Sequence, residues 1–372
     1  MNKSVSIIGT RGYPSYYGGF ETAVRKLAPY LVDHGWDVTV YGRTGASLLN
    51  DPAIDTRVRV ITTPGIESKS LSTLSHGFTA CVHAAVKRPD VTLVMNVANG
   101  FWLPLLRVRG IPTLINVDGI EWDRAKWNRV AKFVFHTGAK LTARLGTRMV
   151  YDSREIARRW ESEFAVEGDF IPYGGDEPAE LKLEPALKSK QYILMVARFV
   201  PENSVPEFIE AAKVLSERWM IVIVGSSGYG GELDEAVASL QDSSPNILWL
   251  GHISDDRRLH ALWQHAGAYF HGHSVGGTNP ALVQAMACGA PIVARDTPYN
   301  REVVGDQGMF VAPRSNAIVS GLTQVMEDPS LQRRLAEDAL RRARDEYSWN
   351  LVNSRYDEAL NKLVSRRAAK QN

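Results

Sequence analysis

The sequence predicts an α/β protein of two domains, each with a parallel sheet of the nucleotide-binding type. Two glycine-rich turns indicate this, at residues 9–19 and 271–279, because each follows an apolar strand and precedes a helix. The length agrees, since 372 residues at roughly 150 per domain allow two domains that each bury a core.

In the first half, short apolar strands alternate with helical segments, an order typical of a parallel sheet with crossover helices. The first helix is predicted to begin near Gly19 and end at Gly35, because the apolar residues from Phe20 to Leu31 share one face. Gly18 and Gly19 would hold the amides of this helix start close to a ligand phosphate. The predicted strands cover residues 5–8, 38–41, 58–62, 92–96, 113–116 and 149–151.

The pattern breaks at residues 170–178, where Pro, Gly and acidic residues indicate a linker. A second series then begins, with strands predicted at residues 192–197, 220–225 and 246–250. The predicted domains are therefore residues 1–170 and 178–349. An amphipathic helix at residues 350–372 is expected to pack back on the first domain.

The second glycine-rich turn has the features of a phosphate site. Gly276 and Gly277 let the backbone approach a ligand, and Thr278 or Asn279 can cap a helix whose first residue is Pro280. The free amides at that helix start would bind an anion. An ordinary turn and helix of an α/β domain is the alternative.

Several classes of protein are disfavoured. Gly9 and Gly12 do not fit the G-x-G-x-x-G spacing of a dinucleotide site, and no P-loop pattern occurs. The formal net charge of +2 argues against a nucleic-acid partner. Cys81 and Cys288 lack pairing or metal spacing, and no apolar run approaches about 20 residues, so a cytoplasmic location without signal peptide or membrane span is expected.

Four separated motifs, in this order along the chain, resemble glycosyltransferase family 4 and, within it, the bacterial rhamnosyltransferase branch. They lie at residues 9–22, 116–127, 197–203 and 271–280, and the resemblance covers nearly the whole chain. It implies the GT-B fold, in which two Rossmann-like domains with parallel sheets face an interdomain cleft. The C-terminal domain would hold most of the nucleotide and the N-terminal domain most of the acceptor.

The resemblance also implies an activity. The enzyme would move a sugar, with L-rhamnose from dTDP-rhamnose as the favoured donor, onto a lipid-linked cell-surface glycan precursor, with retention of anomeric configuration. A UDP- or GDP-hexose transferase of the same fold is one alternative. A nucleotide-sugar-binding module with little catalysis is the other.

Arg198 directly follows an apolar strand, where its guanidinium could reach a diphosphate. A surface ion pair with Glu202 or Glu210 is the alternative. In the family, this Arg acts with a Lys five residues on, and that position holds Asn203 here. Arg301 is a candidate replacement for the missing cation, although an exposed helical ion pair explains it equally well.

The family also uses two Glu residues, the first facing the donor sugar and the second binding the ribose. Gly276 and Gln284 occupy these positions, so the turn must bind the sugar through amides and polar side chains, and the ribose contact becomes neutral. The donor-binding residues implied are Gly18, Gly19, Arg198, Asn203, Ile253, Gly276, Gly277, Thr278, Asn279 and Gln284.

Metal-independent transfer without a cofactor is expected. No D-x-D motif occurs, because Asp255 and Asp256 are adjacent and lie in a predicted helix start. Amides from two helix starts, together with Arg198, could stabilise the leaving diphosphate. In retention, the leaving phosphate itself can take the acceptor proton, so no pair of carboxylates is required.

On the acceptor side, Asp118 follows the strand at residues 113–116 and could orient or deprotonate the acceptor hydroxyl. Glu121 is the second candidate for this role. A turn residue before Gly119 explains Asp118 equally well. Three histidines, His136, His271 and His273, are expected to be hydrogen-bonded structural residues rather than bases.

Residues 124–151 contain seven Lys or Arg residues and no acid. Arg129, Lys132, Lys140 and Arg144 share one helical face, which predicts contact with anionic lipid at the inner face of the plasma membrane. A solvated helical face is the alternative, and Gly138 is a possible break in the helix.

Overall fold

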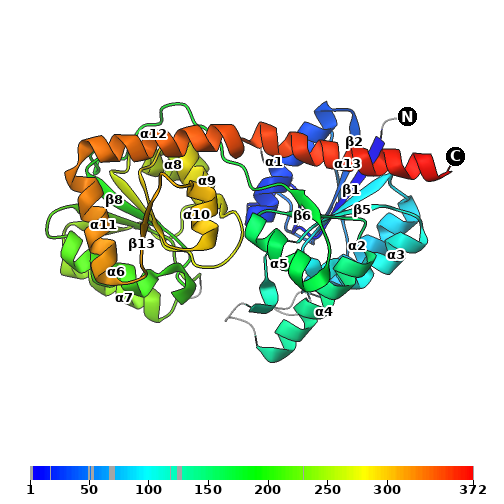
Figure 1. Ribbon diagram of the computed structural model, residues 1–372, viewed down its shortest axis with the longest axis horizontal. Coiled ribbons are helices and arrows are strands. Elements are labelled where there is room, and N and C mark those ends of the chain that lie inside the picture. The colour runs from blue at the N-terminus through cyan, green and yellow to red at the C-terminus, as the bar shows by residue number, and fades with distance from the viewer. Residues whose placement is uncertain are drawn as a thin grey trace. The chain divides into compact units, whose positions relative to one another are not determined.

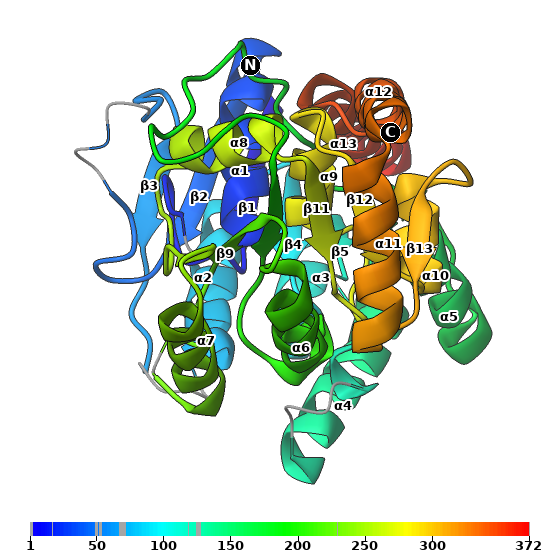
Figure 2. The same ribbon diagram turned by 90° about the vertical axis from the view of Figure 1, so that its left-hand side faces the viewer.

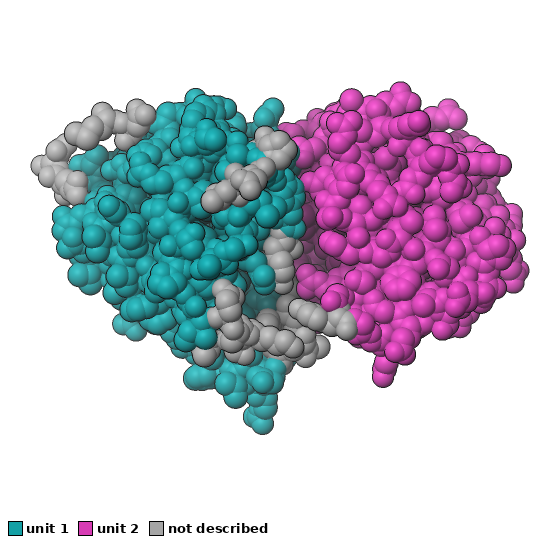
Figure 3. Space-filling view, turned by 180° about the vertical axis from the view of Figure 1, so that it is seen from behind, with its two compact units in different colours: residues 1–173, 349–372 teal, residues 174–348 magenta. Residues whose placement is uncertain are grey.

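The computed structural model describes residues 3–16, 18–48, 51, 54–66, 72–117, 119–123, 128–228 and 230–371. The chain divides into two compact units, shown in two colours in Figure 3. Unit 1 comprises residues 1–173 and 349–372, and unit 2 comprises residues 174–348. The limits predicted from the sequence, at residues 170, 178 and 349, lie close to these boundaries.

Unit 1 contains a seven-stranded parallel sheet in the order β3-β2-β1-β4-β5-β6-β7. Figure 1 labels β1, β2, β5 and β6 of this sheet. Because β4 lies beside β1, the strand order reverses between these two strands. The strands are β1 (Lys3–Ile8), β2 (Trp36–Gly42), β3 (Arg59–Thr62), β4 (Val91–Met95), β5 (Thr113–Asn116), β6 (Arg148–Tyr151) and β7 (Gly168–Phe170).

Helices cover this sheet, and the last one comes from the far end of the sequence. Val352, Tyr356 and Leu360 of the C-terminal helix enter the same core as Leu27 and Leu31. Unit 1 therefore contains the predicted packing of a C-terminal helix on the first domain. The helices are α1 (Gly19–Asp33), α2 (Ser72–Lys87), α3 (Leu103–Val108), α4 (Arg129–Leu145), α5 (Arg154–Phe164) and α13 (Trp349–Gln371), with 3-10 turns η1 (Val97–Trp102) and η2 (Glu121–Asp123).

Unit 2 contains a six-stranded parallel sheet in the order β10-β9-β8-β11-β12-β13. Its strands are β8 (Tyr192–Val196), β9 (Met220–Val224), β10 (Ile247–Trp249), β11 (Ala268–His271), β12 (Ile292–Arg295) and β13 (Met309–Val311). Its helices are α6 (Val205–Leu215), α7 (Glu232–Ser243), α8 (Asp256–His265), α9 (Pro280–Ala287), α10 (Pro298–Val304), α11 (Ser315–Glu327) and α12 (Pro329–Glu346), with the 3-10 turn η3 (Pro201–Asn203).

Both faces of this sheet are buried, as expected for a parallel sheet. Leu194 on β8 packs in one core with residues of α8, α9 and α12, whereas its neighbours Ile193 and Met195 pack in a second core with α6, α7 and α11. Figure 2 looks onto unit 2 and shows α11 lying in front of the sheet. Strands β8, β9 and β10 therefore consist of apolar runs, which is why the sequence revealed them.

Local sequence signals determine where several helices begin and end. The first helix begins at Gly19 and Gly35 has a φ of +80° just after its end, which confirms the predicted limits. Asp255 caps α8 by accepting from the amides of Arg257 and Arg258. The adjacent acids at this position are therefore part of a helix start, as predicted.

The possible break at Gly138 does not occur, because α4 continues through this residue. A Cβ on Gly138 would lie 2.8 Å from the carbonyl oxygen of Val97, and a Cβ on Gly100 would lie 2.2 Å from the carbonyl oxygen of Gly138. This glycine therefore permits close packing between α4 and η1 rather than ending the helix.

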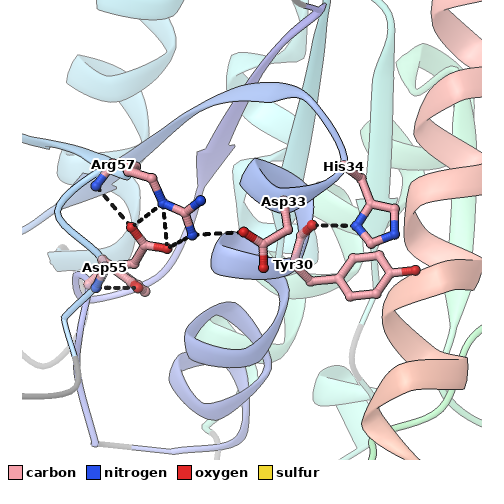
Figure 4. A network of polar contacts seen from close by, with 6 residues as sticks. Tyr30, Asp33, His34, Asp55 and Arg57 are labelled. Atoms are coloured by element: carbon pink, nitrogen blue, oxygen red, sulfur yellow. Dashed lines mark hydrogen bonds and ion pairs between the residues drawn. The ribbon is translucent and has the colours of Figure 1, made fainter.

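A surface network fastens the loop before β3 to the end of α1 (Figure 4). The Arg57 guanidinium contacts Asp55 at 2.6 Å and Asp33 at 2.8 Å. His34 donates from Nδ1 to the carbonyl oxygen of Tyr30 at 2.7 Å. The hydrogen bond from Arg57 lowers the pKa of Asp55. Because Arg57 and Asp33 are solvent-exposed, this network contributes local order more than global stability.

Candidate functional site

The candidate donor site of unit 2 lies where its strand order reverses, between β8 and β11. In open α/β sheets, ligands bind beyond the carboxyl ends of the strands at such a point. Arg198 follows β8 by two residues and is exposed, and the glycine-rich turn follows β11 directly. The structure therefore brings together the two segments that the sequence assigned to the donor.

Hydrogen bonds fasten these two loops to each other. Ser204 donates from Oγ to the carbonyl oxygen of Gly272 at 2.9 Å. Ser274 donates to the carbonyl oxygen of Glu202 from its amide, at 3.0 Å, and from its hydroxyl, at 2.7 Å. A Cβ on Gly272 would lie 2.3 Å from the carbonyl oxygen of Asn203, so the loops approach closely only because this residue is glycine.

Asn203 is buried and points into its own loop. Its Nδ2 donates to the carbonyl oxygen of Arg198 at 2.9 Å. Asn203, which occupies the position of the family's second cation, thus holds the backbone of Arg198. Its contact with the donor stays a prediction.

Asn279 and Pro280 form the predicted start of α9. The side chain of Asn279 accepts from the amide of Ala281 at 3.0 Å, and Pro280 is the first helical residue. Gly276 has a φ of +114°, a conformation that favours glycine, and Thr278 is buried. Anion-binding amides at this helix start are consistent with this geometry.

Gln284, predicted to contact the ribose, makes two hydrogen bonds to Asp176. Its Oε1 accepts from the Asp176 amide at 2.9 Å, and its Nε2 donates to the Asp176 carbonyl oxygen at 2.7 Å. These bonds compete with the predicted ribose contact. The Gln284 side chain therefore holds the backbone of Asp176, a role that the comparison with the family's Glu does not predict.

The surroundings of Arg301 and Ile253 also account for these two residues without a contact to the donor. Arg301 forms an ion pair with Asp296, at 2.6 Å from Nε to Oδ1, and stacks on Phe310. The ion-pair interpretation of this residue is therefore the one that the geometry favours. Ile253 is buried and belongs to the hydrophobic core of unit 2.

Two histidines stack on each other where β11 ends, His271 in the strand and His273 in the turn that follows. The rings of His271 and His273 lie 4.3 Å apart at 11°, and Nδ1 of His271 shares a hydrogen bond with the Tyr269 hydroxyl. Burial, followed by the charge of Arg198, lowers the pKa of His273 to about 4. Burial also lowers the pKa of His271. Both rings are therefore neutral near pH 7.

The third histidine, His136, lies on α4. It contacts Glu163 at 2.8 Å and lies beside the ring of Trp122. A structural role, as predicted for these histidines, fits this position.

In unit 1, the strand order reverses between β1 and β4. Gly18 precedes α1 and Gly19 begins it, in the loop that follows β1. Glu21 is buried, and its carboxylate accepts from the amide of Arg11 at 3.0 Å. This carboxylate orders the loop in which the predicted phosphate contacts lie.

Asp118, the first candidate for acceptor activation, lies outside the described residues. Glu121, the second candidate, is buried in η2. The catalytic roles of both carboxylates stay predictions.

The predicted membrane-contact residues differ in exposure. Arg129, Lys140 and Arg144 are exposed, whereas Lys132 is half-buried. Two apolar side chains share the exposed surface of the helix, Val130 at 72% exposed and Phe133 at 71%. These apolar side chains add to the basic residues on which the predicted membrane contact rests.

Sequence reasoning also missed a polar cavity in unit 1. It lies at the carboxyl ends of β1, β2 and β3, against α2, and its lining includes Arg43, Thr63, Thr73 and His76. These residues come from three separate segments, so no single motif could have revealed the cavity.

Two kinds of feature are absent from the described part of the chain. It contains no helix long and apolar enough to cross a membrane. It also contains no group of three or more His, Cys, Asp or Glu residues placed to hold a metal ion.

Two family models match the chain. Residues 178–342 match the model described as glycosyl transferases group 1. The matched residues lie within unit 2. Residues 2–176 match a domain of unknown function, DUF1972.

Three similar proteins are named as glycosyltransferases, in agreement with the model that residues 178–342 match. The chain is 22% identical over 388 residues to an uncharacterized glycosyltransferase of Methanocaldococcus jannaschii, covering 95% of this chain and 98% of the relative. It is 28% identical over 406 residues to an MMP alpha-(1->4)-mannosyltransferase of Mycolicibacterium hassiacum, covering 95% and 97%. It is 26% identical over 182 residues to an N,N'-diacetylbacillosaminyl-diphospho-undecaprenol alpha-1,3-N-acetylgalactosaminyltransferase of Campylobacter jejuni, covering 48% and 46%.

Solved structures share the fold. Sucrose-phosphate synthase from Thermosynechococcus elongatus aligns with a TM-score of 0.81 at 17% identity, covering 98% of this chain and 100% of that one. HepE from Anabaena, in complex with UDP, aligns with a TM-score of 0.74 at 16% identity, covering 97% and 100%. The fold is GT-B, with two Rossmann-like parallel-sheet domains, and the matches together support a glycosyltransferase.

Proposed function

We propose that this chain is a retaining glycosyltransferase that moves L-rhamnose from dTDP-rhamnose onto a lipid-linked cell-surface glycan precursor. One observation carries the donor half of the proposal. The exposed guanidinium of Arg198 and the capped start of α9 follow the two strands that flank the reversal of strand order in unit 2. A guanidinium and free helix amides are the groups that recognise a diphosphate.

The proposed chemistry needs no metal and no cofactor. As the bond between the anomeric carbon and the diphosphate oxygen breaks, Arg198 and the amides of α9 receive the negative charge that develops on the diphosphate. The acceptor oxygen bonds to the anomeric carbon on the same face, and its proton passes to the departing phosphate. Asp118 or Glu121 would orient the acceptor hydroxyl.

We further propose that α4 brings the enzyme to the cytoplasmic face of the plasma membrane. Its exposed surface combines Arg129, Lys140 and Arg144 with the apolar side chains of Val130 and Phe133. Basic residues attract anionic headgroups, and apolar side chains enter the interface. An undecaprenol-linked acceptor in the name of one relative is consistent with this location.

A thermal-shift screen against dTDP, UDP, GDP and ADP sugars tests the donor, because a preferred ligand stabilises the native state by mass action. We expect dTDP-rhamnose to give the largest shift. Turnover in the presence of EDTA then tests metal independence, and NMR of the product linkage tests retention. Loss of activity with EDTA and recovery with Mg²⁺ or Mn²⁺ would refute metal-independent transfer.

A hexose transferase using UDP or GDP is the alternative favoured by the relatives. Several are named as mannosyltransferases, and HepE was solved with UDP. A larger thermal shift with a UDP or GDP sugar than with dTDP-rhamnose would favour this alternative.

A binding module with little catalysis is the third candidate. It is favoured by Asn203 and Gln284, whose amides already bond to the backbone of their own unit. Nucleotide binding without turnover, measured with a membrane extract as the acceptor source, would support it.

A further inference from the structure

The turn after β11 and the loop after β8 lie beside each other where the strand order of unit 2 reverses. In the paired strands, Phe270 lies opposite Met195. The same register, continued by three residues, brings His273 opposite Arg198. The electrostatics agree with this placement, because burial and then the charge of Arg198 lower the pKa of His273. The two side chains are therefore neighbours at the edge of the sheet where a ligand is expected.

Several contacts hold His273 in place. The buried side chain of Asn300 donates from Nδ2 to the carbonyl oxygen of His273 at 2.9 Å. The next residue, Ser274, donates to the carbonyl oxygen of Glu202 through both its amide and its hydroxyl. The ring itself stacks on that of His271. The position of this imidazole is therefore fixed by the protein alone.

The two ring nitrogens of His273 have different surroundings. Nδ1 is buried and has no hydrogen-bond partner among the described residues. The ring as a whole is only half-buried, and Nε2 is the nitrogen that is not enclosed. An unpaired buried nitrogen is tolerated better as a bare lone pair than as an N–H group. The proton of the neutral imidazole is therefore assigned to Nε2, which makes this atom a hydrogen-bond donor.

We propose that His273 is a donor-binding residue, which donates a hydrogen bond from Nε2 to the diphosphate of the nucleotide sugar, beside Arg198. This inference rests on the proposed function of the chain. An imidazole N–H and a guanidinium on neighbouring strands both donate to phosphate oxygens. Because the imidazole is already held in place, it stabilises the charge that develops on the leaving diphosphate without reorganising. His273 acts here as an uncharged donor and not as a base.

NMR of the full chain labelled with ¹⁵N-histidine tests the tautomer and the contact directly. We expect the His273 signals, assigned by comparison with His273→Gln, to show a proton on Nε2. Saturation with dTDP-rhamnose, UDP-glucose or GDP-mannose, whichever binds, should shift the Nε2 signal. A proton on Nδ1, or an Nε2 signal that does not change at saturation, would overturn the proposal.

Calorimetry with the same nucleotide sugar separates a donor contact from a structural role. His273→Phe keeps a ring in the stack but removes the N–H group, so we expect the affinity to fall about tenfold or more. His273→Gln should restore most of the affinity, because its side-chain amide can also donate. The matched control is His34→Phe, since His34 stacks on Tyr30 but lies exposed at the end of α1, and its affinity should equal that of the parent.

Failure of this inference differs from failure of the proposed function. If Arg198→Ala loses affinity and a folded His273→Phe does not, His273 lies outside a donor site that still exists. If the parent binds no nucleotide sugar, the proposed function is wrong and this inference with it. The NMR result decides the matter even if His273→Phe does not fold.

Discussion

Gln284 holds the backbone of Asp176 with both ends of its side-chain amide. The two hydrogen bonds measure 2.9 Å at the Asp176 amide and 2.7 Å at its carbonyl oxygen. Asp176 is among the first residues of unit 2, which begins at Gly174. The helix whose start is proposed to bind the donor therefore also anchors the first residues of its unit.

Replacing Gln284 by Leu is expected to destabilise unit 2. The change removes these partners from the amide and the carbonyl oxygen of Asp176, and a loss of this kind costs about 1–3 kcal/mol. Urea unfolding measures the effect, with exposed Gln191→Leu as the control. An unchanged free energy of unfolding would show that solvent replaces the lost bonds.

Nucleotide binding by Gln284 variants tests the ribose contact separately. The sequence predicts that Gln284→Glu keeps or tightens binding and that Gln284→Leu loosens it. Calorimetry at a temperature where both variants are folded distinguishes the two roles. Equal nucleotide affinity in the Leu variant would leave only the contact with Asp176.

Arg198→Ala should weaken donor binding by about 1.5–3 kcal/mol, because a charge-assisted bond to the diphosphate is lost. This corresponds to a roughly 10- to 150-fold rise in the dissociation constant. Arg218→Ala is the control, since Arg218 precedes β9 at the opposite ends of the strands and pairs with Glu327. A folded Arg198→Ala protein that binds the donor like the parent would exclude Arg198 from the site.

His273 should make the stability of unit 2 depend on pH. Burial and the charge of Arg198 lower its pKa from 6.5 to about 4 in the folded protein. The unfolded state therefore binds the proton more readily, and stability is lost as pH falls from about 6.5 towards 4, by at most about 3 kcal/mol. Urea unfolding at a series of pH values measures the effect. His273→Gln should make the free energy of unfolding less dependent on pH over this range, whereas the control, His252→Gln at an exposed histidine, should not.

Gly100→Ala should loosen α4. Its Cβ would lie 2.2 Å from the carbonyl oxygen of Gly138 and 2.5 Å from the Thr142 hydroxyl, so the helix must move. Overpacking of this kind costs about 1–3 kcal/mol. Thermal unfolding should report it, and Gly231→Ala is the control, since its Cβ would meet nothing within 4 Å.

Changing Arg129, Lys132, Lys140 and Arg144 together to Gln should reduce binding to anionic liposomes while leaving donor binding intact. Attraction of the parent should fall with salt, as the Debye length decreases from about 10 Å at 0.1 M to about 3 Å at 1 M. Phe133→Ser tests the apolar contribution separately. Equal co-sedimentation of parent and quadruple variant would identify this face as merely solvated.

Most strands of both sheets could be predicted from the sequence, because many of them are buried on two faces and therefore consist of apolar runs. The strand β13 (Met309–Val311) was missed although it is apolar, since a run of three residues is too short to be distinctive. The strand at residues 113–116 has the predicted limits, whereas β7 (Gly168–Phe170) was missed because its composition, Gly-Asp-Phe, lacks such a run. The predicted strand at residues 92–96 extends one residue too far, because Asn96 has a φ of +77° and caps η1 by accepting from the amide of Ala98.

The candidate donor site was predictable where it depends on the order of strand, turn and helix, as with Arg198 and Asn279. It was not predictable where a side chain finds its partner elsewhere in the fold. Asn203 and Gln284 were interpreted through the roles of the family's residues, whereas their contacts are with the backbone of Arg198 and Asp176. The Arg43 cavity depends on segments that meet only after folding.

Unit 2 is inserted within the sequence of unit 1, and this has a consequence for synthesis on the ribosome. Residues 174–348 leave the ribosome as one uninterrupted piece and can complete their fold early. The core of unit 1 stays open at that stage, because it still lacks Trp349, Tyr356 and Leu360. The segment translated first is therefore the last to become fully native, and a ribosome that stalls before α13 releases a chain whose N-terminal half exposes apolar surface.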